Sequence, residues 1–284
     1  LADGGHISRN PTAQLSILLD LISLRDALVD RQLEVPGPIL NAVDRMMPMV
    51  RFFRHGDGKL ALFNGSTEGP DGTIDAALSY DDAKGKPFGF APHSGYQRLV
   101  AGPTFVIADT GPPPPGRFSH SAHAGSLSFE MSVGRCRLVT NCGDARIFGE
   151  DWRIASRATA AHSTGVLADT SSARFTQGTL SRVLLGPRLI EGPSHVNSRR
   201  NETDDGIWLE ASHNGYENNF GVLHRRRLFL ATSGEDLRGE DTMHRISRED
   251  VRPWHKRYWR KEEGSLGFTI RFHLHPDAKA SLAH

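Results

Sequence analysis

The hydrophobic pattern divides the chain into two parts, and the first is helical. Apolar residues recur at helical spacing over the first thirty positions, at Leu15, Leu18, Leu19, Ile22, Leu24 and Leu28. Asn10-Pro11 is typical of a helix start, because an Asn side chain caps free amides and proline fits the first turn. Val35-Pro-Gly-Pro38 ends this helix, and a second helix is expected over about residues 39–49. The pattern therefore predicts a helical hairpin.

From residue 51 onward, short alternating runs separated by Gly, Pro, Asn and Asp predict strands. The expected strands are Leu60–Phe63, Tyr96–Val100, Thr104–Ala108, Ala161–Ala168, Gly206–Ala211, Arg227–Ala231 and Phe268–Leu274, with a hairpin over 118–143. One helical stretch, Thr73–Asp82, interrupts them. Many short strands with turn signals between them indicate an antiparallel β-sandwich. The predicted class is α+β, with helices in residues 1–50 and a large antiparallel β-sandwich in residues 51–284.

The expected hairpin carries polar residues at its open end. Its turn is expected at Ser132–Gly134, His123 precedes the first arm, and Asn141 ends the second. Because the open ends of two paired arms lie side by side, His123 and Asn141 are expected to share one site. With His162, at the start of a further strand, they form a ligand set for a divalent ion or a hydrogen-bonded cluster without metal. Asn brings no charge and is a poorer zinc ligand than a carboxylate.

Composition limits the classes of function. The 284 residues are 38% hydrophobic and 24% charged, with a formal net charge of +1. These values are typical of a folded globular protein and give no general attraction to nucleic acid. No apolar run reaches the roughly 20 residues of a membrane span. A serine hydrolase is disfavoured, because no Gly-x-Ser-x-Gly elbow is present. The chain begins at Leu1 without a signal-peptide pattern, so we expect it to be a piece of a longer protein.

Several segments, in order, resemble the heparinase II/III-like family of polysaccharide lyases. Ala122-His-Ala-Gly-Ser-Leu-Ser-Phe-Glu130 is similar to the family's His-x-His-Ala-Asp-x-Leu-Ser-Phe, and Leu138-Val-Thr-Asn-Cys-Gly143 to its strand ending in Asp-x-Gly. Residues 157–164 look like its His-Asn-Thr strand, and residues 208–216 like its His-Asp-Gly-Tyr segment. Residues 3–11 are similar to the segment Asp-Gly-Gly-x-x-Glu-x-Ser-Pro. The resemblance covers most of the chain.

The resemblance implies a fold and a reaction. The fold is an α/α-toroid followed by a β-sandwich, and residues 1–50 would be the last toroid helices. The reaction is β-elimination on an acidic, uronate-containing polysaccharide or oligosaccharide. We expect the catalytic groups in this chain to be His6, Arg9 and His120, with Arg9 pairing with a carboxylate and a histidine moving a proton. The residues expected to contact the substrate are His213, Tyr216 and Arg225.

The resemblance also implies a structural zinc ion held by His123, Asn141 and His162. Several positions depart from the family. Among them, Asn141 stands where the family has Asp, Gly125 replaces the Asp after His-Ala, and Ser121 stands at the position of the catalytic His, next to His120. The alternative is a non-catalytic glycan-binding or cell-envelope protein that keeps the lyase fold. A metal-dependent enzyme of another type, built on the sandwich, is less favoured. A bacterial source and a periplasmic or exported location are implied by the family alone.

Overall fold

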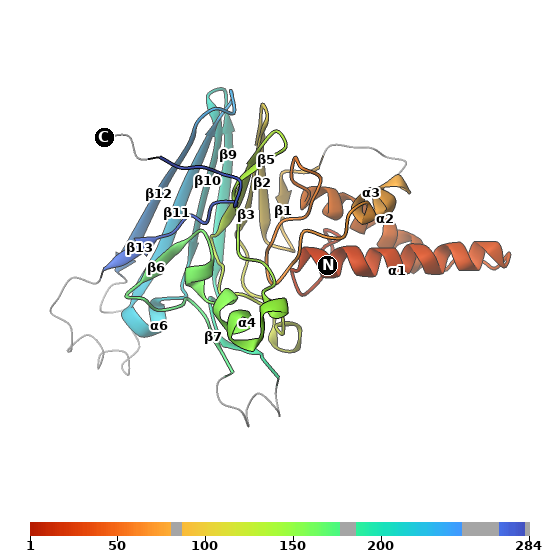
Figure 1. The fold of residues 1–284 in the computed structure, drawn as a ribbon, viewed down its shortest axis with the longest axis horizontal. Coiled ribbons are helices and arrows are strands. Elements are labelled where there is room, and N and C mark those ends of the chain that lie inside the picture. Colours follow the sequence, from red (N-terminus) through yellow and green to blue (C-terminus); the bar gives the residue numbers. More distant parts are fainter. Residues whose placement is uncertain (81–86, 177–185, 246–266, 282–284) are drawn as a thin grey trace.

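The protein is built in three layers: helices, a five-stranded sheet and a four-stranded sheet (Figure 1). The computed structural model describes residues 1–80, 87–176, 186–245 and 267–281. Both large sheets are antiparallel, and their inner faces enclose one core. Helices followed by an antiparallel β-sandwich are therefore confirmed.

The helical layer consists of α1 (Pro11–Asp30), α2 (Gly37–Phe52) and α3 (Thr73–Ser79). The side chain of Asn10 caps α1 by accepting a hydrogen bond from the amide of Ala13 at 2.9 Å. Pro36 precedes α2, where a proline costs no helical hydrogen bond. The predicted helical hairpin is confirmed, and the two helices pack together through one continuous apolar core with α3.

The five-stranded sheet has the order β1–β2–β3–β4–β5, and the four-stranded sheet the order β12–β11–β10–β9. The bounds in the first are Phe90–Ala91, Tyr96–Ala101, Thr104–Asp109, Phe129–Val133 and Cys136–Val139. Those in the second, in chain order, are Val196–Thr203, Gly206–His213, Val222–Ala231 and Leu237–Arg245. Leu99, Val106 and Phe129 of the first sheet pack against Leu209 and Leu228 of the second.

The five-stranded sheet is covered on both faces. Tyr96 and Ile107 belong to the helical core, while their neighbours Leu99 and Val106 belong to the core between the sheets. This division follows from the alternation of side chains along a strand. On β4 the residue facing the helical side is Glu130, which bonds to the loop that follows α2. That loop is therefore attached to the sheet by polar contacts.

Short elements lie at the end of the sandwich where β6, α4 and α6 gather in Figure 1. They are η1 (Gly116–Phe118), η2 (Arg146–Phe148), α4 (Glu150–Ser156), η3 (Thr159–Ala161), β6 (Gly165–Leu167), β7 (Arg174–Phe175), β8 (Leu189–Glu191), α6 (Glu217–Phe220) and β13 (Phe268–Ile270). β6 pairs with β13, and β7 pairs with β8. Four predicted site residues lie in the loops next to these short elements: His120, His123, Asn141 and His162.

Several predicted strand bounds are wrong. Residues 60–63 form no strand, because Leu60, Ala61 and Phe63 are buried among the helices. Of Ala161–Ala168, only Gly165–Leu167 is a strand. The hairpin turn lies one residue later than expected, with Val133 paired to Cys136 across Gly134. β9 and β12 were not predicted. They are edge strands with mostly polar sequences, which hides the apolar alternation.

Among the described residues, no helix has the length and apolar character that crossing a membrane requires.

Candidate functional site

His123 and His162, which the sequence predicts to share a site, are in direct contact. His123 Nδ1 lies 3.1 Å from His162 Nε2, and the two rings are nearly perpendicular at 82°. His162 Nδ1 lies 2.9 Å from the carbonyl oxygen of Ala158, so it donates its proton there. Nε2 of His162 is then free to accept the proton of His123 Nδ1. A Cβ at Gly125 would lie 2.7 Å from the His162 ring, so glycine leaves room for the pair.

Both imidazoles are neutral at neutral pH. Burial lowers the pKa of His162 to about 4. Burial is the main reason that the pKa of His123 lies well below its ordinary value, and electrostatic interactions with His162 and Arg157 lower it further. Both rings are buried, at 6% and 1% exposure. A neutral imidazole can accept a hydrogen bond or bind a metal, so the remaining ligands decide between these functions.

Asn141 lies beside the pair but is held by a different partner. Its side-chain nitrogen donates to Glu130 Oε1 at 3.1 Å, and its backbone amide donates to the same oxygen at 3.0 Å. Its side-chain oxygen accepts a hydrogen bond from the amide of Ser163, next to His162 in the chain, at 3.4 Å. The orientation of Asn141 is therefore set by Glu130.

This donor set does not fit zinc. Among the described residues, no group of three or more His, Cys, Asp or Glu side chains is placed to hold a metal ion. Structural zinc takes four ligands, with thiolates or carboxylates supplying negative charge alongside imidazole. Here the third member of the predicted set is a neutral amide, and the charges that act on His123 come from Arg157 and Arg153. The geometry favours a hydrogen-bonded cluster.

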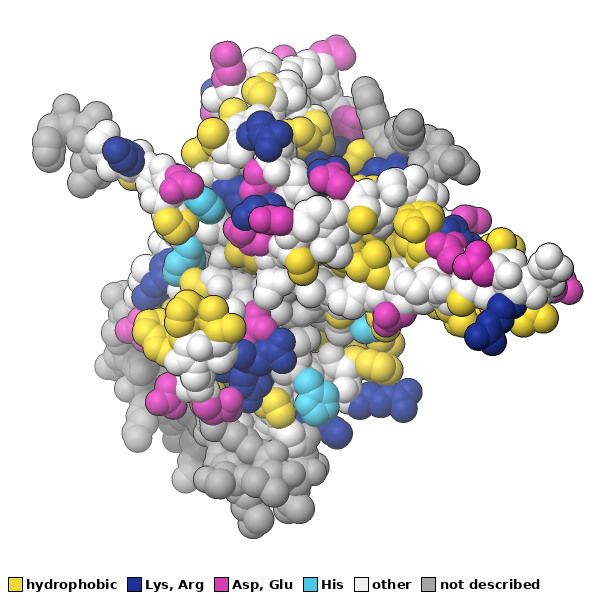
Figure 2. Space-filling model, turned by 45° about the vertical axis from the view of Figure 1, so that its right-hand side comes forward, with side chains coloured by type: hydrophobic (Ala, Val, Ile, Leu, Met, Phe, Trp, Pro, Cys, Tyr) yellow, Lys and Arg dark blue, Asp and Glu magenta, His cyan; other side chains and the backbone are white. Residues whose placement is uncertain are grey.

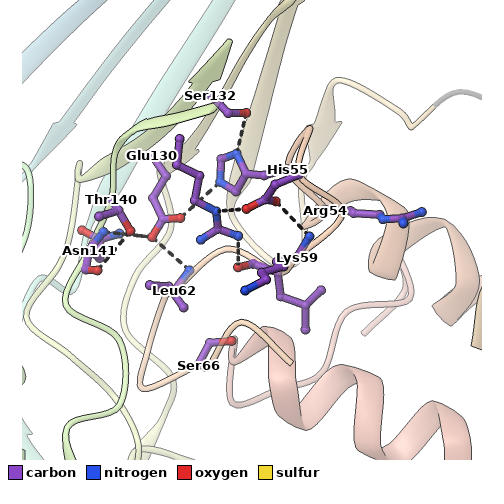
Figure 3. A network of polar contacts seen from close by, with 12 residues as sticks. Arg54, His55, Lys59, Leu62, Ser66, Glu130, Ser132, Thr140 and Asn141 are labelled. Carbon is purple, nitrogen blue, oxygen red and sulfur yellow. Dashed lines mark hydrogen bonds and ion pairs between the residues drawn. The ribbon is translucent and has the colours of Figure 1, made fainter. Parts of the chain in front are cut away.

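Glu130 anchors a second buried network, which sequence reasoning missed (Figure 3). His55 Nε2 donates to Glu130 Oε2 at 3.1 Å, and the Ser132 hydroxyl donates to His55 Nδ1 at 3.0 Å. Burial would raise the pKa of Glu130, but the hydrogen bond and charge of His55 lower it below its ordinary value. The order of the three groups is that of a hydrolase triad. Ser132 is 0% exposed, however, so the network attaches the loop after α2 to the sheet. The signal in the sequence was Glu130 and Ser132 at alternate positions of β4.

The predicted substrate contacts His213 and Tyr216 are buried, at 2% and 0% exposure. His213 Nδ1 accepts from the amide of Gly215 at 3.0 Å, and its Nε2 donates to His224 Nδ1 at 3.2 Å. The hydroxyl of Tyr216 donates to the carbonyl of Gly165 at 3.0 Å. Arg225, the third predicted contact, is partly exposed and pairs with Glu210. The structure does not bring these three residues together around one cavity.

The three predicted catalytic residues have different environments. Arg9 is 6% exposed, and its guanidinium pairs with Asp109 and donates to the carbonyl of Ser94 at 2.7 Å, so it is bound inside the protein. His6 is partly exposed, with Nδ1 2.7 Å from the Ser8 hydroxyl. His120 is exposed, and a Cβ at Gly186 would lie 2.8 Å from its ring. His120 is therefore the predicted catalytic group that is open to solvent.

A cavity of about 560 Å³ lies beside the histidine pair, and we call it the arginine pocket. Its lining residues are Arg153, Ile154, Arg157, Ala158, Thr170, Ser171, Ala173, Arg174, Phe175, Thr176, Pro187 and Asn219. They include three arginines and no carboxylate. The guanidinium of Arg157 lies 3.9 Å above the Phe175 ring and donates to the carbonyl of Ala122 at 2.8 Å. Ala158, which accepts the proton of His162, belongs to the same wall.

The pocket thus combines positive charge with apolar surface. Such a combination suits a ligand that presents ring faces together with acidic groups. The neutral histidine pair lies next to this pocket, because His162 donates a hydrogen bond to the carbonyl of Ala158, one of the lining residues.

Comparison with known proteins places this geometry in context. Residues 83–284 match the family described as Heparinase II/III-like, C-terminal. The chain is 40% identical over 285 residues to FtsZ-localized protein C of Caulobacter vibrioides (strain NA1000 / CB15N). That alignment covers 100% of this chain and 47% of the relative, so the chain spans about half the relative's length.

Solved structures with a similar fold include a heparan sulfate lyase and a heparinase III gene product. The heparan sulfate lyase HepC from Pedobacter heparinus superposes with a TM-score of 0.57 at 15% identity, over 82% of this chain and 37% of that one. A heparinase III gene product superposes with a TM-score of 0.61 at 17% identity, with the same coverage. At these identities the superpositions show the fold alone.

Proposed function

Because the chain belongs to the heparinase II/III-like family, we propose that it binds an acidic, uronate-containing polysaccharide or oligosaccharide in the arginine pocket. The observation that carries the proposal is the composition of the pocket wall. Arg153, Arg157 and Arg174 line it without any lining carboxylate, and Phe175 supplies an aromatic surface. A guanidinium forms paired hydrogen bonds with a carboxylate, and apolar surface packs against sugar rings.

Two of the arginines are available for exchange with a ligand. Arg174 pairs with Glu191 at 2.8 Å, and Arg153 with Glu150 at 2.7 Å, and both glutamates are exposed to solvent. Solvent-exposed ion pairs contribute about 0–1 kcal/mol. A uronate carboxylate therefore displaces either partner at small cost. Arg157, fixed on the carbonyls of Ala122 and Ser119, positions the Phe175 ring.

β-Elimination is the second candidate, and the position of His120 favours it. The reaction needs a group that moves a proton and groups that stabilise the developing negative charge. His120 is exposed, and its ring lies against Gly186, which precedes the pocket residue Pro187. The contact with Gly186 supports a role for His120 beside the proposed glycan site. Arg9, enclosed by Asp109 and backbone carbonyls, takes no part in this candidate.

A single experiment separates these candidates. The purified protein is incubated with polyglucuronate and with heparan sulfate, and both retention on the immobilised glycan and near-ultraviolet absorbance of unsaturated products are followed. Retention without new absorbance supports a binding protein. Retention with absorbance that is lost in His120→Ala supports the lyase. Failure to retain either polymer at low salt overturns the proposal.

A cell-envelope location is part of the proposal, since an acidic glycan substrate lies in or beyond the envelope. Fluorescence of a tagged protein in intact bacteria, compared before and after release of the periplasmic fraction, tests it. Release with that fraction supports the location, and full retention in spheroplasts contradicts it.

A further inference from the structure

A second cavity, which we call the loop pocket, lies between α2, the loop that follows it and β2. Its volume is about 550 Å³. Its cationic lining residues are Arg51, Arg54, Lys59, Arg98 and Arg135, and its acidic ones are Asp57, Asp71 and Asp75. It shares no lining residue with the arginine pocket. An inference about it is therefore independent of the proposed glycan site.

Part of this charge is neutralised inside the protein. Arg54 pairs with Asp75, and Lys59 pairs with Glu68. Asp57 is occupied by Arg137, which does not line the cavity, at 2.8 Å. Within the described part of the chain, neither Arg98 nor Arg135 forms an ion pair. The loop pocket thus holds more positive than negative charge.

Arg98 is the unusual member of the set, because it is 4% exposed. Its guanidinium donates to the carbonyls of Phe52 at 2.7 Å and Arg54 at 3.0 Å, where α2 ends. Its Nε is buried and has no hydrogen-bond partner. Burial lowers the pKa of Arg98 to about 10. The C-terminus of α2 carries about half a negative charge. About half of the positive charge of Arg98 is therefore without a counter-charge.

The walls of the loop pocket are held firmly in place. A Cβ at Gly56 would lie 1.6 Å from the carbonyl oxygen of Gly134, so the loop rests directly on the hairpin turn that carries Arg135. Gly58 adopts a φ of 91°, which a side chain would strain, and its carbonyl accepts from Arg54 at 2.9 Å. His55, fixed by Glu130, anchors the loop from behind (Figure 3). A cavity with fixed walls and fixed cations loses little entropy when it binds a ligand.

We propose that the loop pocket binds a small ligand through a phosphate-class oxyanion, with Arg98 at its floor and Arg135 at its rim. A phosphate ester carries about −1.5 to −2 charges at pH 7, which matches two unpaired guanidinium groups. A single carboxylate or sulfate ester carries about one charge and matches them less well. Guanidinium groups bind phosphate oxygens in a forked geometry, and the free Nε of Arg98 is one such donor.

Calorimetric titration of pyrophosphate into the purified protein at low ionic strength tests this inference. We expect saturable binding at one site. Arg135→Gln, at an exposed position, is expected to raise Kd about tenfold, the loss of one charge-assisted hydrogen bond. Arg98→Met is expected to abolish binding. The matched control is Arg238→Gln, which removes an exposed arginine of β12 that pairs with Asp236 and is expected to leave Kd unchanged.

Three results would overturn the inference. The first is no saturation with the wild-type protein. The second is an equal loss in Arg135→Gln and Arg238→Gln, which would mean that only overall charge matters. The third is binding of sulfate or glucuronate as tight as that of pyrophosphate, which would assign the cavity to a glycan substituent. Arg98→Met removes a buried contact, so its thermal unfolding is recorded, and Arg135→Gln decides the outcome if Arg98→Met does not fold.

Discussion

Two buried histidine pairs have nearly the same geometry and different chemistry. The rings of His123 and His162 lie 5.1 Å apart at 82°, and those of His213 and His224 lie 5.1 Å apart at 89°. The first pair ends on a backbone carbonyl, that of Ala158. The second ends on a carboxylate, that of Asp241, which His224 Nε2 reaches at 2.7 Å. The neighbouring groups, and not the ring contact, therefore decide what each pair does.

The second pair is part of an ionic network. Arg226 donates to both oxygens of Asp241 at 2.8 Å and to the carbonyls of Leu127 and Ser163 across the sandwich. Burial would raise the pKa of Asp241, but hydrogen bonds from His224 and Arg226 lower it to about 2. The hydrogen bonds of the first pair join only neutral groups, the two imidazoles and the carbonyl of Ala158. Removing Asp241 from the second network leaves the buried charge of Arg226 without a counter-charge, whereas breaking the first pair leaves no such charge.

The largest effect is expected for Asp241→Asn. The substitution leaves Arg226, with 4% of its side chain exposed, without its counter-charge. Removing one partner of a buried pair costs about 3–5 kcal/mol, which urea unfolding at pH 7 measures. Arg238→Gln, on the same strand at 74% side-chain exposure, serves as control and is expected within about 0.5 kcal/mol of wild type. A loss under about 1 kcal/mol for Asp241→Asn would contradict the contrast between the pairs.

Acid lowers stability in two steps, because the buried histidines of both pairs and the buried carboxylate of Asp241 titrate in different pH windows. His162 has a pKa of about 4 when folded and about 6.5 when unfolded, so the unfolded state binds the proton first. Its contribution, about 3 kcal/mol, is complete above pH 6.5 and is lost as the pH falls toward 4. Asp241, with a folded pKa of about 2, loses its contribution below about pH 4. Chemical unfolding from pH 8 to 2 measures both, and a flat profile down to pH 5 would contradict the first step.

A smaller effect is expected for His162→Gln. The amide keeps a donor and an acceptor near Ala158 and His123, so the cost is that of one poorly satisfied buried group, about 1–3 kcal/mol. Urea unfolding at pH 7 measures it, and the loss between pH 6.5 and 4 should shrink in the same variant. If His162→Gln lost more free energy of unfolding at pH 7 than Asp241→Asn, the first pair would be the more important one for stability, which would contradict the comparison.

The smallest effect expected is that of metal on the wild-type protein. Asn141 is bound to Glu130, and the described residues contain no group of three or more His, Cys, Asp or Glu side chains that could hold a metal ion. Elemental analysis should therefore find no stoichiometric zinc, and a chelator should leave the melting temperature unchanged. Asn141→Asp sharpens this prediction, since it adds the missing charge. The variant should melt lower without zinc, because its carboxylate faces Glu130, and gain stability when zinc is added. One equivalent of zinc in the wild type would show that the neutral set binds metal.

The sequence predicted the large elements because their patterns are strong. The leucine spacing after Asn10 and the alternation in β2, β3 and β4 are local signals, and each matches an observed element. β9 and β12 were missed, since an edge strand facing solvent on much of its surface keeps polar residues. Leu60 was assigned to a strand because burial among helices and burial in a sheet look alike over four residues.

The contacts among the predicted site residues could be predicted only in part, for a similar reason. Residues at strand ends could be grouped, so His123 and His162 were correctly brought together. Which partner each group takes depends on contacts between distant segments, and these leave no local pattern. Arg9 meets Asp109 one hundred residues away, and Glu130 meets His55 at a separation of 75. The cavity formed by Arg153, Arg157 and Arg174 depends on the fold around β7 and could not be read from spacing.

The measurement that tests the central claim most directly is calorimetric titration of a uronate oligosaccharide into three proteins: wild type, Arg174→Gln and the control Arg238→Gln. Arg174 lines the arginine pocket and is 63% exposed, so its replacement should leave folding intact. We predict saturable binding to the wild type and the control, and a Kd raised about tenfold in Arg174→Gln, the loss of one charge-assisted contact. Equal affinity of all three proteins, or no binding to the wild type, would contradict the assignment of the glycan to this pocket.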